Sequence, residues 1–201
     1  TPEGYARNPE LVINFYNERR KQLLDVVPNA GHLGVADLER DFNVTVVTQN
    51  VDNLHERAGS THVIHLHGEL TKVCSSRDPY NPHFVKELAP EEYEVKLGDK
   101  AGDGTQLRPF IVWFGESVPE IETAIRYVEQ ADIFVIIGTS LNVYPAAGLL
   151  NYVPRAAEVY LIDPKPVDTH VMRPIHVIQK GASEGVKELK ALLTVTQPPL
   201  P

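Results

Sequence analysis

The residues best suited to chemistry are polar clusters that directly follow short apolar runs. Gln49, Asn50 and Asp52 come immediately after the run from Val44 to Thr48. Their amide and carboxylate groups could orient a ligand in a crevice at the end of a buried strand. They could also be caps that satisfy free backbone N–H groups at the start of a helix. Taken singly, each residue favours the cap.

His67 ends a second short run, Val63 to His67, directly before Gly68 and Glu69. Alternation along a strand places His65 and His67 on the same face. Two histidines are too few for a zinc site, whereas a neutral imidazole accepts a proton near physiological pH and suits a general base. A lone histidine is more often structural, so the spacing alone does not decide its role.

Two turns follow apolar runs in the second half of the sequence. At Gly138-Thr139-Ser140 the glycine lets the backbone approach a ligand, and the hydroxyls can bond phosphate or ribose oxygens. Asp163 ends the next run at a separation close to that of the ribose-binding acid in a dinucleotide fold. Asp163-Pro164 is also ordinary turn chemistry, and both roles can hold together.

Two extended segments could bind a peptide. Residues 108–116 combine an apolar run with a Gly-Glu stop, and residues 143–147 closely follow the Gly-Thr-Ser turn. Either could be plain core, with Trp113 in the core or in a pocket wall. Alternatively, two strands with unpaired edges could clamp a peptide between them by β-augmentation.

The elements that must position these groups alternate between helix and strand. Continuous β-branched runs are typical of strands covered on both faces, as in a parallel sheet. We therefore expect an α/β fold with a doubly wound parallel sheet and ligand chemistry at the carboxyl ends of its strands. Helices are expected over residues 9–26, 29–41, 119–131 and 183–193, and strands over residues 44–48, 63–67, 132–137 and 158–162.

The interval from Thr71 to Arg108 breaks this pattern. Pro, Gly, Asp, Lys and Glu are frequent there, and apolar residues are scattered. This composition predicts an insertion or small subdomain in place of sheet core.

Bulk composition excludes several classes of protein. With 201 residues and 42% hydrophobic content, the chain can bury one substantial core. A net charge of −8 argues against a nucleic-acid partner, because phosphate binding needs clustered Lys and Arg. No apolar run approaches a membrane span, and Cys74, the single cysteine, can form no internal disulfide. We expect a cytoplasmic protein that does not bind a membrane.

Read together, four motifs resemble those of sirtuins, most closely the bacterial ones, in order and setting. They are Thr48-Gln49-Asn50-Val51-Asp52-Asn53-Leu54-His55, His67-Gly68-Glu69-Leu70, Phe114-Gly115-Glu116 and Gly138-Thr139-Ser140. The resemblance runs from Thr1 to Ser183. It implies a Rossmann-like fold and an NAD-dependent removal of acyl groups from protein lysines, which gives free lysine, nicotinamide and O-acyl-ADP-ribose.

The resemblance also implies roles for individual residues. His67 would be the general base, Asn50 and Asp52 would be catalytic with it, and His65 would be only a strand neighbour. Asp163 stands where the family usually has Asn, and a carboxylate can still accept a ribose hydrogen bond. The residues that would hold NAD are Gln49, Asn50, Asp52, Gly138, Thr139, Ser140, Asp163 and Ala182. Those that would hold the acylated-lysine protein are Val112, Phe114, Gly115, Glu116, Asn142, Val143 and Tyr144.

Tyr16 and Arg19 resemble the Tyr-x-x-Arg pattern of sirtuins that remove acidic acyl groups. At i and i+3 of a helix the phenol and the guanidinium share a face, where they could hold a succinyl or malonyl carboxylate. The charged face of an amphipathic helix has the same spacing, so the choice among acetyl, succinyl and malonyl groups stays open.

Two departures from the family pattern concern metal and cofactor. Sirtuins usually carry two Cys-x-x-Cys pairs for structural zinc between the His-Gly and Phe-Gly-Glu motifs, and this interval holds only Cys74. Zinc is therefore expected to be absent, and no residue is assigned to a metal. The Gly-Ala-Gly-x-Ser loop of the family does not appear before Thr1, so we expect a cut chain or missing residues there, and weak NAD binding by this chain itself.

The domain organisation follows from these motifs. Residues 1–70 and 108–201 are expected to form the NAD-binding domain without its first strand, and residues 71–107 a small insertion at the place of the zinc module. Two alternative functions stay open: a sirtuin-like protein ADP-ribosyltransferase, and a non-catalytic module that holds a nucleotide or a peptide.

Overall fold

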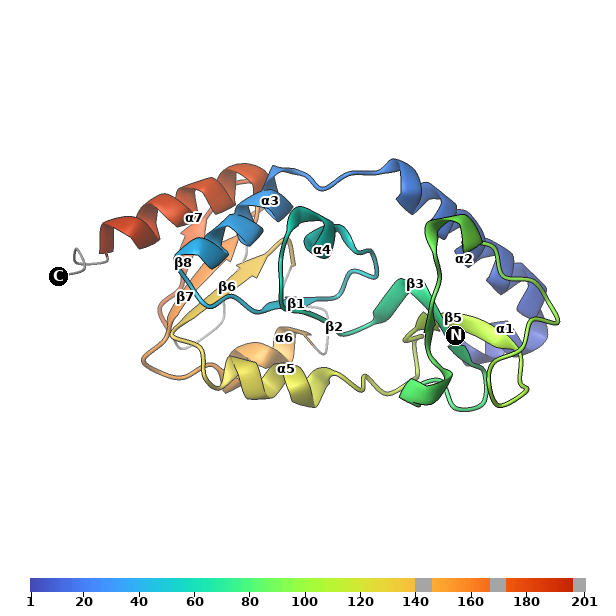
Figure 1. Ribbon diagram of the computed structural model, residues 1–201. Helices are drawn as coiled ribbons and strands as arrows, with labels where there is room; N and C mark the ends of the chain where they lie inside the picture. The colour runs from blue at the N-terminus through green and yellow to red at the C-terminus, as the bar shows by residue number, and fades with distance from the viewer. Residues whose placement is uncertain (140–145, 167–172, 197–201) are drawn as a thin grey trace. The chain divides into compact units, whose positions relative to one another are not determined.

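The computed structural model describes residues 1–139, 146–166 and 173–196, and divides into two compact units (Figure 1). Unit 1 consists of Thr1–Val27, Val47–Asn53 and Ile64–Glu120, and unit 2 of Pro28–Val46, Leu54–Val63 and Ile121–Pro201. The expected insertion, residues 71–107, lies within unit 1. The division of the chain into an NAD-binding domain and an insertion stays a prediction.

Unit 2 contains the parallel sheet that the sequence predicts. Its strands are β6 (Ile133–Ile137), β7 (Glu158–Ile162) and β8 (His176–Ile178), in that order, and both pairs are parallel. The third strand was not expected from the sequence. Val177 is 50% exposed and only Ile178 is buried, so β8 lacks the apolar run that identifies a covered strand.

Helices cover both faces of this sheet. The helices α3 (Ala30–Asp37) and α7 (Ala182–Thr196) lie together on one face, and α5 (Ile121–Val128) lies on the other (Figure 1). At Gly185 an added Cβ would lie 2.2 Å from Cγ2 of Ile162, so the absence of a side chain lets α7 approach β7 closely. The core on this side consists of Val35, Leu38, Tyr160, Ile162, Ile178, Val186, Leu189 and Leu193.

Unit 1 is built on a separate antiparallel sheet. Its strand order is β4 (Lys86–Glu87), β3 (Gly68–Ser75) and β5 (Leu107–Ile111), so β5 is an edge strand. The prediction that residues 71–108 lie outside any sheet core is wrong, because Val73 and Cys74 are fully buried. Only Leu70, Val73 and Cys74 are apolar in β3, and the cover of this sheet comes from distant segments, including Ile13 and Val95. A local composition pattern does not show such partners.

Two helices begin unit 1. The expected long helix is confirmed as α2 (Pro9–Asp25), in which Pro9 occupies the first turn and Asn8 Oδ1 accepts a hydrogen bond from the backbone of Leu11 at 3.0 Å. The short helix α1 (Pro2–Arg7) precedes it and was not expected. The remaining short helical elements are α4 (Leu54–Ala58), α6 (Ala146–Leu149), and the 3-10 turns Leu38–Arg40, Pro82–Phe84, Pro90–Glu92 and Leu150–Tyr152.

Two short strands, β1 (Val46–Thr48) and β2 (Val63–His65), form a third, two-stranded sheet. The expected strand over residues 63–67 therefore ends early, and His67 lies in the turn between β2 and β3. The argument that His65 and His67 share one strand face is wrong for this reason.

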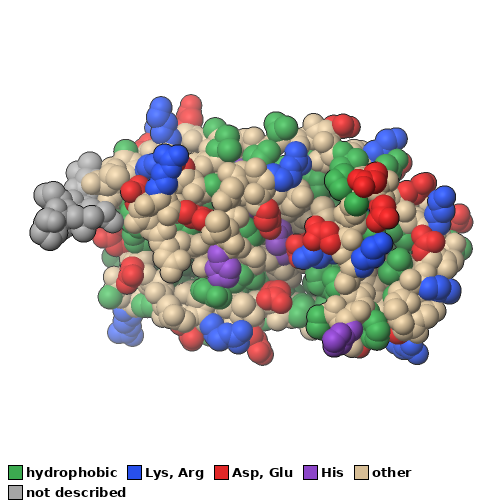
Figure 2. Space-filling model, in the orientation of Figure 1, with side chains coloured by type: hydrophobic (Ala, Val, Ile, Leu, Met, Phe, Trp, Pro, Cys, Tyr) green, Lys and Arg blue, Asp and Glu red, His purple; other side chains and the backbone are tan. Residues whose placement is uncertain are grey.

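The surface mixes both signs of charge. Figure 2 shows acidic and basic side chains interspersed over the face that it views. Among the helices of the described ranges, none is long and apolar enough to cross a membrane.

Candidate active site

The segment after β1 runs beside the turn that carries His67. The backbone N–H of Leu66 donates to the carbonyl of Thr48 at 2.9 Å, and that of Leu70 donates to the carbonyl of Val51 at 2.7 Å. These two hydrogen bonds fix the backbone from Thr48 to Val51 along the β2–β3 turn. Gln49 and Asn50 are thereby brought next to His67 within unit 1.

His67 is half-buried, and its backbone is fixed on a second side. Its carbonyl accepts a hydrogen bond from the backbone of Val112 at 2.9 Å. Gly68 follows with a φ of 83°, and a Cβ there would lie 2.1 Å from the carbonyl oxygen of Phe110. Only glycine fits this turn, which explains its place directly after the histidine. The imidazole of His67 has no hydrogen-bond partner in the described part of the chain.

His65 has a structural contact of its own. The residue is 8% exposed, and Nδ1 of its ring lies 3.1 Å from the carbonyl oxygen of Asn50. The backbone N–H of Asn50 donates to Oγ1 of Thr48 at 3.0 Å. Both contacts hold the Asn50 backbone, and the helix that follows this segment begins only at Leu54.

Two amide oxygens of the same segment are buried without a partner in the described structure. They are Oε1 of Gln49 and Oδ1 of Asn53. Buried acceptors are nearly always hydrogen-bonded, so an unpaired one calls for an explanation, such as a ligand that donates to it. A carboxamide or a ribose hydroxyl has the donors that would satisfy these two oxygens.

Unit 2 holds a second group of the predicted residues. Gly138 follows β6 directly with a φ of 62°, and its N–H donates to the carbonyl of Ile162 at 3.0 Å. Asp163 follows the neighbouring strand β7 directly, and its Oδ1 accepts from the backbone N–H of Lys165 at 2.8 Å. The turn role of Asp163 is therefore present. Ala182 begins α7.

Most of the predicted NAD and peptide residues from Thr139 to Tyr144 lie outside the described ranges. Thr139 follows Gly138 and is half-buried. Ser140, Asn142, Val143 and Tyr144 lie outside the described residues.

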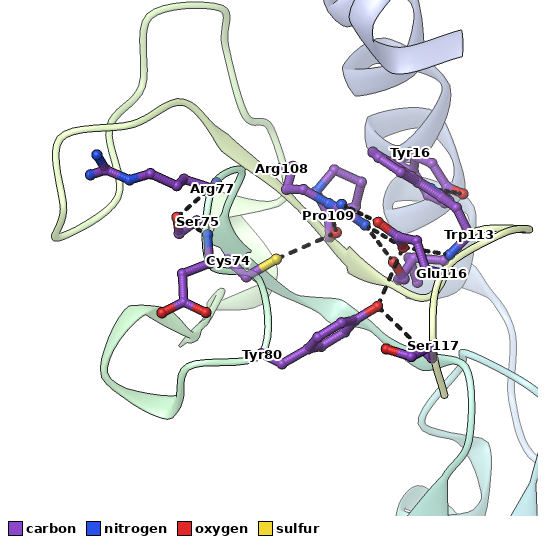
Figure 3. Close-up of polar contacts among 12 residues, drawn as sticks. Tyr16, Cys74, Ser75, Arg77, Tyr80, Arg108, Pro109, Trp113, Glu116 and Ser117 are labelled. Atoms are coloured by element: carbon purple, nitrogen blue, oxygen red, sulfur yellow. Dashed lines mark hydrogen bonds and ion pairs between the residues drawn. The ribbon is translucent and has the colours of Figure 1, made fainter. Parts of the chain in front are cut away.

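The predicted peptide segment, Val112 to Glu116, is anchored by a buried ion pair (Figure 3). Arg108 donates through Nη1 to Oε1 of Glu116 at 2.7 Å and through Nη2 to Oε2 at 3.0 Å. The backbone N–H of Trp113 donates to the same carboxylate at 2.8 Å. Phe114, at the tip of this turn, is 90% exposed. Glu116 thus closes the turn by contacts inside the protein.

The charge state of Glu116 follows from these contacts. Burial raises the pKa of the Glu116 carboxyl, but the hydrogen bonds from Arg108 and Trp113 outweigh burial, so the pKa lies below its ordinary value. Oη of Tyr80 adds a longer hydrogen bond to the carboxylate at 3.4 Å. Burial, followed by the charge of Glu116, raises the pKa of Tyr80 to about 12.

Arg108 and Tyr80 were missed by the sequence reasoning. An arginine between Leu107 and Pro109, within an apolar run, is a signal of a buried cation. The acid that ends the same run, Glu116, is then its nearest candidate partner. Tyr80 carries no such signal, because it lies in the irregular interval.

Tyr16 and Arg19, the predicted acyl-binding pair, have different surroundings. Oη of Tyr16 accepts a hydrogen bond from Nε1 of Trp113 at 3.0 Å. Arg19 is exposed, and its Cζ lies 5.8 Å from the centroid of the Phe15 ring. The rings of Phe15 and Tyr16 meet edge to face at 5.1 Å. Phe15 therefore contacts both members of the pair.

The interval in which sirtuins hold zinc contains a polar cluster in this chain. Oγ of Ser75 donates to Oδ2 of Asp103 at 2.7 Å and accepts from the backbone of Arg77 and Asp78, each at 3.0 Å. Oγ1 of Thr105 donates to Oδ1 of Asp103 at 2.7 Å. Burial raises the pKa of the neighbouring Cys74 thiol to about 12. A thiol that stays protonated is a poor metal ligand.

Comparison with known proteins agrees with this geometry. The model of the Sir2 family matches residues 1–145. An NAD-dependent protein deacylase of Bacteroides thetaiotaomicron is 83% identical over 193 residues, which are 96% of this chain and 82% of that protein. The crystal structure of a Sir2 homolog–NAD complex has a TM-score of 0.81 at 35% identity, over 97% of this chain and 76% of that one.

A further solved structure contains a peptide. The complex described as Sir2-p53 peptide-NAD+ has a TM-score of 0.75 at 26% identity, over 96% of this chain and 82% of that one. A family match over more than half of the sequence, a close relative and a shared fold lead to the same assignment. This chain belongs to the Sir2 family.

Proposed function

We propose that this chain removes acyl groups from protein lysines in an NAD-dependent reaction in which His67 is the general base. The observation that carries the proposal is the backbone bonding around His67. Its turn is hydrogen-bonded to the segment of Gln49 and Asn50 on one side and to Val112 on the other. A base, two amides and a peptide-binding strand are thereby available at one place in unit 1.

The residues of unit 1 suit the nicotinamide end of NAD. The unpaired buried oxygens of Gln49 and Asn53 can accept hydrogen bonds from a carboxamide and a ribose hydroxyl. In unit 2, the carboxyl ends of β6 and β7 are where a parallel sheet holds a dinucleotide, and Gly138 and Asp163 lie there. When bound, NAD supplies nicotinamide as the leaving group and ADP-ribose as the acceptor of the acyl group.

His67 suits a base because its imidazole has no competing hydrogen bond within the described residues. A neutral imidazole can take the proton of a ribose hydroxyl, which makes that oxygen nucleophilic toward the acyl carbon. Asn50 and Asp52 would orient the groups around that hydroxyl, and no protein nucleophile is required.

The acylated protein would add to the edge of unit 1. β5 is an edge strand, and Val112 follows its last paired residue, ahead of the turn that Glu116 closes. An extended peptide can pair with such an edge through backbone hydrogen bonds that tolerate many sequences. Tyr16 and Arg19 would contact the acyl group, with the acidic acyl groups favoured. The cytoplasmic location and the absence of a nucleic-acid partner stay predictions from composition.

The test measures nicotinamide release by the full-length protein with NAD and an acetyl-lysine or succinyl-lysine peptide. Release is expected to require the acylated peptide and to fall at least about 100-fold in His67→Ala, as for the loss of a general base. His83→Ala is the matched control, because His83 is exposed in the turn Pro82–Phe84 and lies outside the proposed site.

Three outcomes would contradict the proposal. Full activity of His67→Ala would overturn the assignment of the base. A lasting label on a target protein from labelled NAD would favour an ADP-ribosyltransferase. Binding of NAD or peptide by calorimetry, with no nicotinamide produced, would favour a non-catalytic module.

A further inference from the structure

The hydroxyl of Tyr16 has a defined orientation in this structure. Its partner is the indole N–H of Trp113, with Nε1 and Oη 3.0 Å apart (Figure 3). An indole nitrogen can only donate, so the phenol oxygen is the acceptor in this bond. The phenolic proton must therefore point away from the indole, and it has no acceptor among the described residues.

Trp113 is itself fixed on three sides, so that its N–H has one direction. Its backbone N–H donates to Glu116 at 2.8 Å, and the guanidinium of Arg108 lies over its ring, with Cζ 3.5 Å from the centroid. The ring of Tyr5 packs against it at 5.2 Å between centroids. The side chain is only 6% exposed, which leaves it little freedom to turn.

We propose that Trp113 is a positioning residue that sets the preference for acidic acyl groups by orienting the hydroxyl of Tyr16 as a donor. The inference rests on the proposed function, including the role of Tyr16 and Arg19 at the acyl group. A carboxylate at the end of an acyl chain accepts the phenolic hydrogen bond, and the methyl group of an acetyl chain does not.

Arg19 and Arg20 have different surroundings on α2. Arg20 is buried and donates to backbone and amide oxygens, the nearest at 2.6 Å on Asn17. Arg19 is exposed, and in the described structure it has no carboxylate partner. Its contact with Phe15, which also touches Tyr16, keeps an unpaired cation near the oriented phenol.

The experiment compares kcat/KM for succinyl-lysine and acetyl-lysine peptides of one sequence in the full-length protein. Trp113→Phe keeps an aromatic ring beneath Arg108 and removes the N–H. The succinyl-to-acetyl ratio is expected to fall about tenfold, which is the scale of one hydrogen bond, through a higher KM for the succinyl peptide. In a Tyr16→Phe background, Trp113→Phe is expected to change the ratio no further.

Tyr5→Phe is the matched control. Its hydroxyl is buried without a partner in the described structure, and its ring touches the same indole. Removing this hydroxyl leaves the bond between Trp113 and Tyr16 intact, so the ratio is expected to stay at the wild-type value.

A second measurement does not change Trp113. It is the only tryptophan of the sequence, so the tryptophan emission of the protein comes from this side chain. Tyr16→Phe removes the acceptor of the indole N–H and is expected to shift the emission maximum, whereas Tyr5→Phe is not. If Trp113→Phe does not fold, the emission shift and the selectivity of Tyr16→Phe decide the question.

The proposal is overturned if Trp113→Phe lowers both peptides equally, if it leaves the ratio unchanged, or if its effect adds to that of Tyr16→Phe. It is also overturned, with the proposed deacylation intact, if the wild-type protein deacetylates but does not prefer the succinyl peptide. Failure of the proposed function would give a different result, because neither substrate would then cause nicotinamide release.

Discussion

Arg108 and Glu116 form a two-bond ion pair across the turn that follows β5, with side-chain exposures of only 5% and 14%. The carboxylate also accepts a hydrogen bond from the backbone N–H of Trp113. Glu116 therefore both neutralises the charge of Arg108 and closes the turn. Removing either partner leaves the other charge buried without a counter-charge. The pair therefore has consequences for stability that differ from those of a surface ion pair.

Arg108→Met is expected to destabilise the fold by about 3–5 kcal/mol, because it leaves the carboxylate of Glu116 buried without its counter-charge. Unfolding by urea, followed by circular dichroism, measures the loss. Lys86→Met is the control, since the Lys86–Glu92 pair is 62% and 57% exposed and its loss should cost less than about 1 kcal/mol. Equal effects of the two variants would contradict the structural role of the buried pair.

Glu116 also predicts a dependence of stability on pH. Its pKa is lowered in the folded state, so the stabilisation is fully present above the unfolded value of 4.5 and is lost as pH falls through the folded pKa. The free energy of unfolding of the wild type should therefore drop below about pH 4.5. In Glu116→Gln this contribution should be missing, so the difference between the two proteins should shrink as the pH is lowered. A difference that stays constant down to pH 3 would be evidence against it.

Neighbouring arginines on α2 make a second matched comparison. Arg20 is 3% exposed and donates to the carbonyl of Tyr93 at 2.7 Å and to Asn17 at 2.6 Å. Arg20→Met takes the donor from the Tyr93 carbonyl and leaves Asn17 Oδ1 with only the backbone N–H of Val95 at 3.0 Å, and it is expected to cost about 2–4 kcal/mol of stability. Arg19→Met should change stability by less than about 0.5 kcal/mol, because its side chain is exposed.

Arg19→Met, which should hardly change stability, is the variant of this pair that is expected to change substrate binding. Arg19→Met is expected to raise KM for a succinyl-lysine peptide and to leave KM for an acetyl-lysine peptide close to the wild-type value. A succinyl KM that does not respond to Arg19→Met would remove Arg19 from the proposed acyl site while leaving the stability comparison intact.

Cys74 predicts an unreactive thiol. It is fully buried, with Sγ 3.7 Å from the carbonyl oxygen of Pro109, and burial raises its pKa to about 12 from an ordinary value of 9. At pH 8 the folded protein should react with iodoacetamide much more slowly than the urea-unfolded chain, because the thiolate is the nucleophile. Since the folded pKa is the higher one, stability should also fall as pH rises above 9. Rapid labelling of the native protein would contradict the burial.

The parallel sheet of unit 2 could be predicted because its signal is local. The residues of β6, and those of β7 after Glu158, are apolar without interruption, since a covered strand needs no polar face. β8 was not predicted from the sequence, because this strand is largely exposed and lacks the long apolar run of a covered strand. The sheet of unit 1 escaped for a different reason, because β3 and β5 become buried through contacts with residues far away in the sequence, such as Ile13 and Val95.

The candidate site divides in the same way. His67 and Gly68 could be found as a motif, because the turn that holds the histidine requires a glycine at that point. Arg108 carries only the signal of a charged residue within an apolar run, and Tyr80 carries none, since its importance comes from meeting Glu116 in space. The hydrogen bond between Trp113 and Tyr16 joins residues 97 positions apart, a contact that no single-sequence pattern contains.

The cluster around Asp103 predicts that unit 1 is stable without a metal. The carboxylate accepts hydrogen bonds from Ser75, Thr105 and Arg77, and Ser75 Oγ in turn accepts two backbone N–H groups. The hydrogen bond from Thr105, with those from Ser75 and Arg77, outweighs burial and lowers the pKa of the Asp103 carboxyl. The hydrogen bonds of Asp103 therefore join the segment of Ser75 and Arg77 to the segment of Asp103 and Thr105, as the ligands of a bound metal would.

Asp103→Asn is accordingly expected to lower Tm, because the amide can accept at only one of the two carboxylate positions and carries no charge. Asp78→Asn is the control, since Asp78 is an exposed acid of the same loop with a hydrogen bond only to Asn81 among its side-chain contacts. Differential scanning fluorimetry with and without 1,10-phenanthroline tests the metal directly. The wild-type Tm should not respond to the chelator, because the only thiol of the interval is buried and protonated. A Tm that falls with chelator and recovers with added zinc would mean that a metal, and not the Asp103 cluster, holds these loops together.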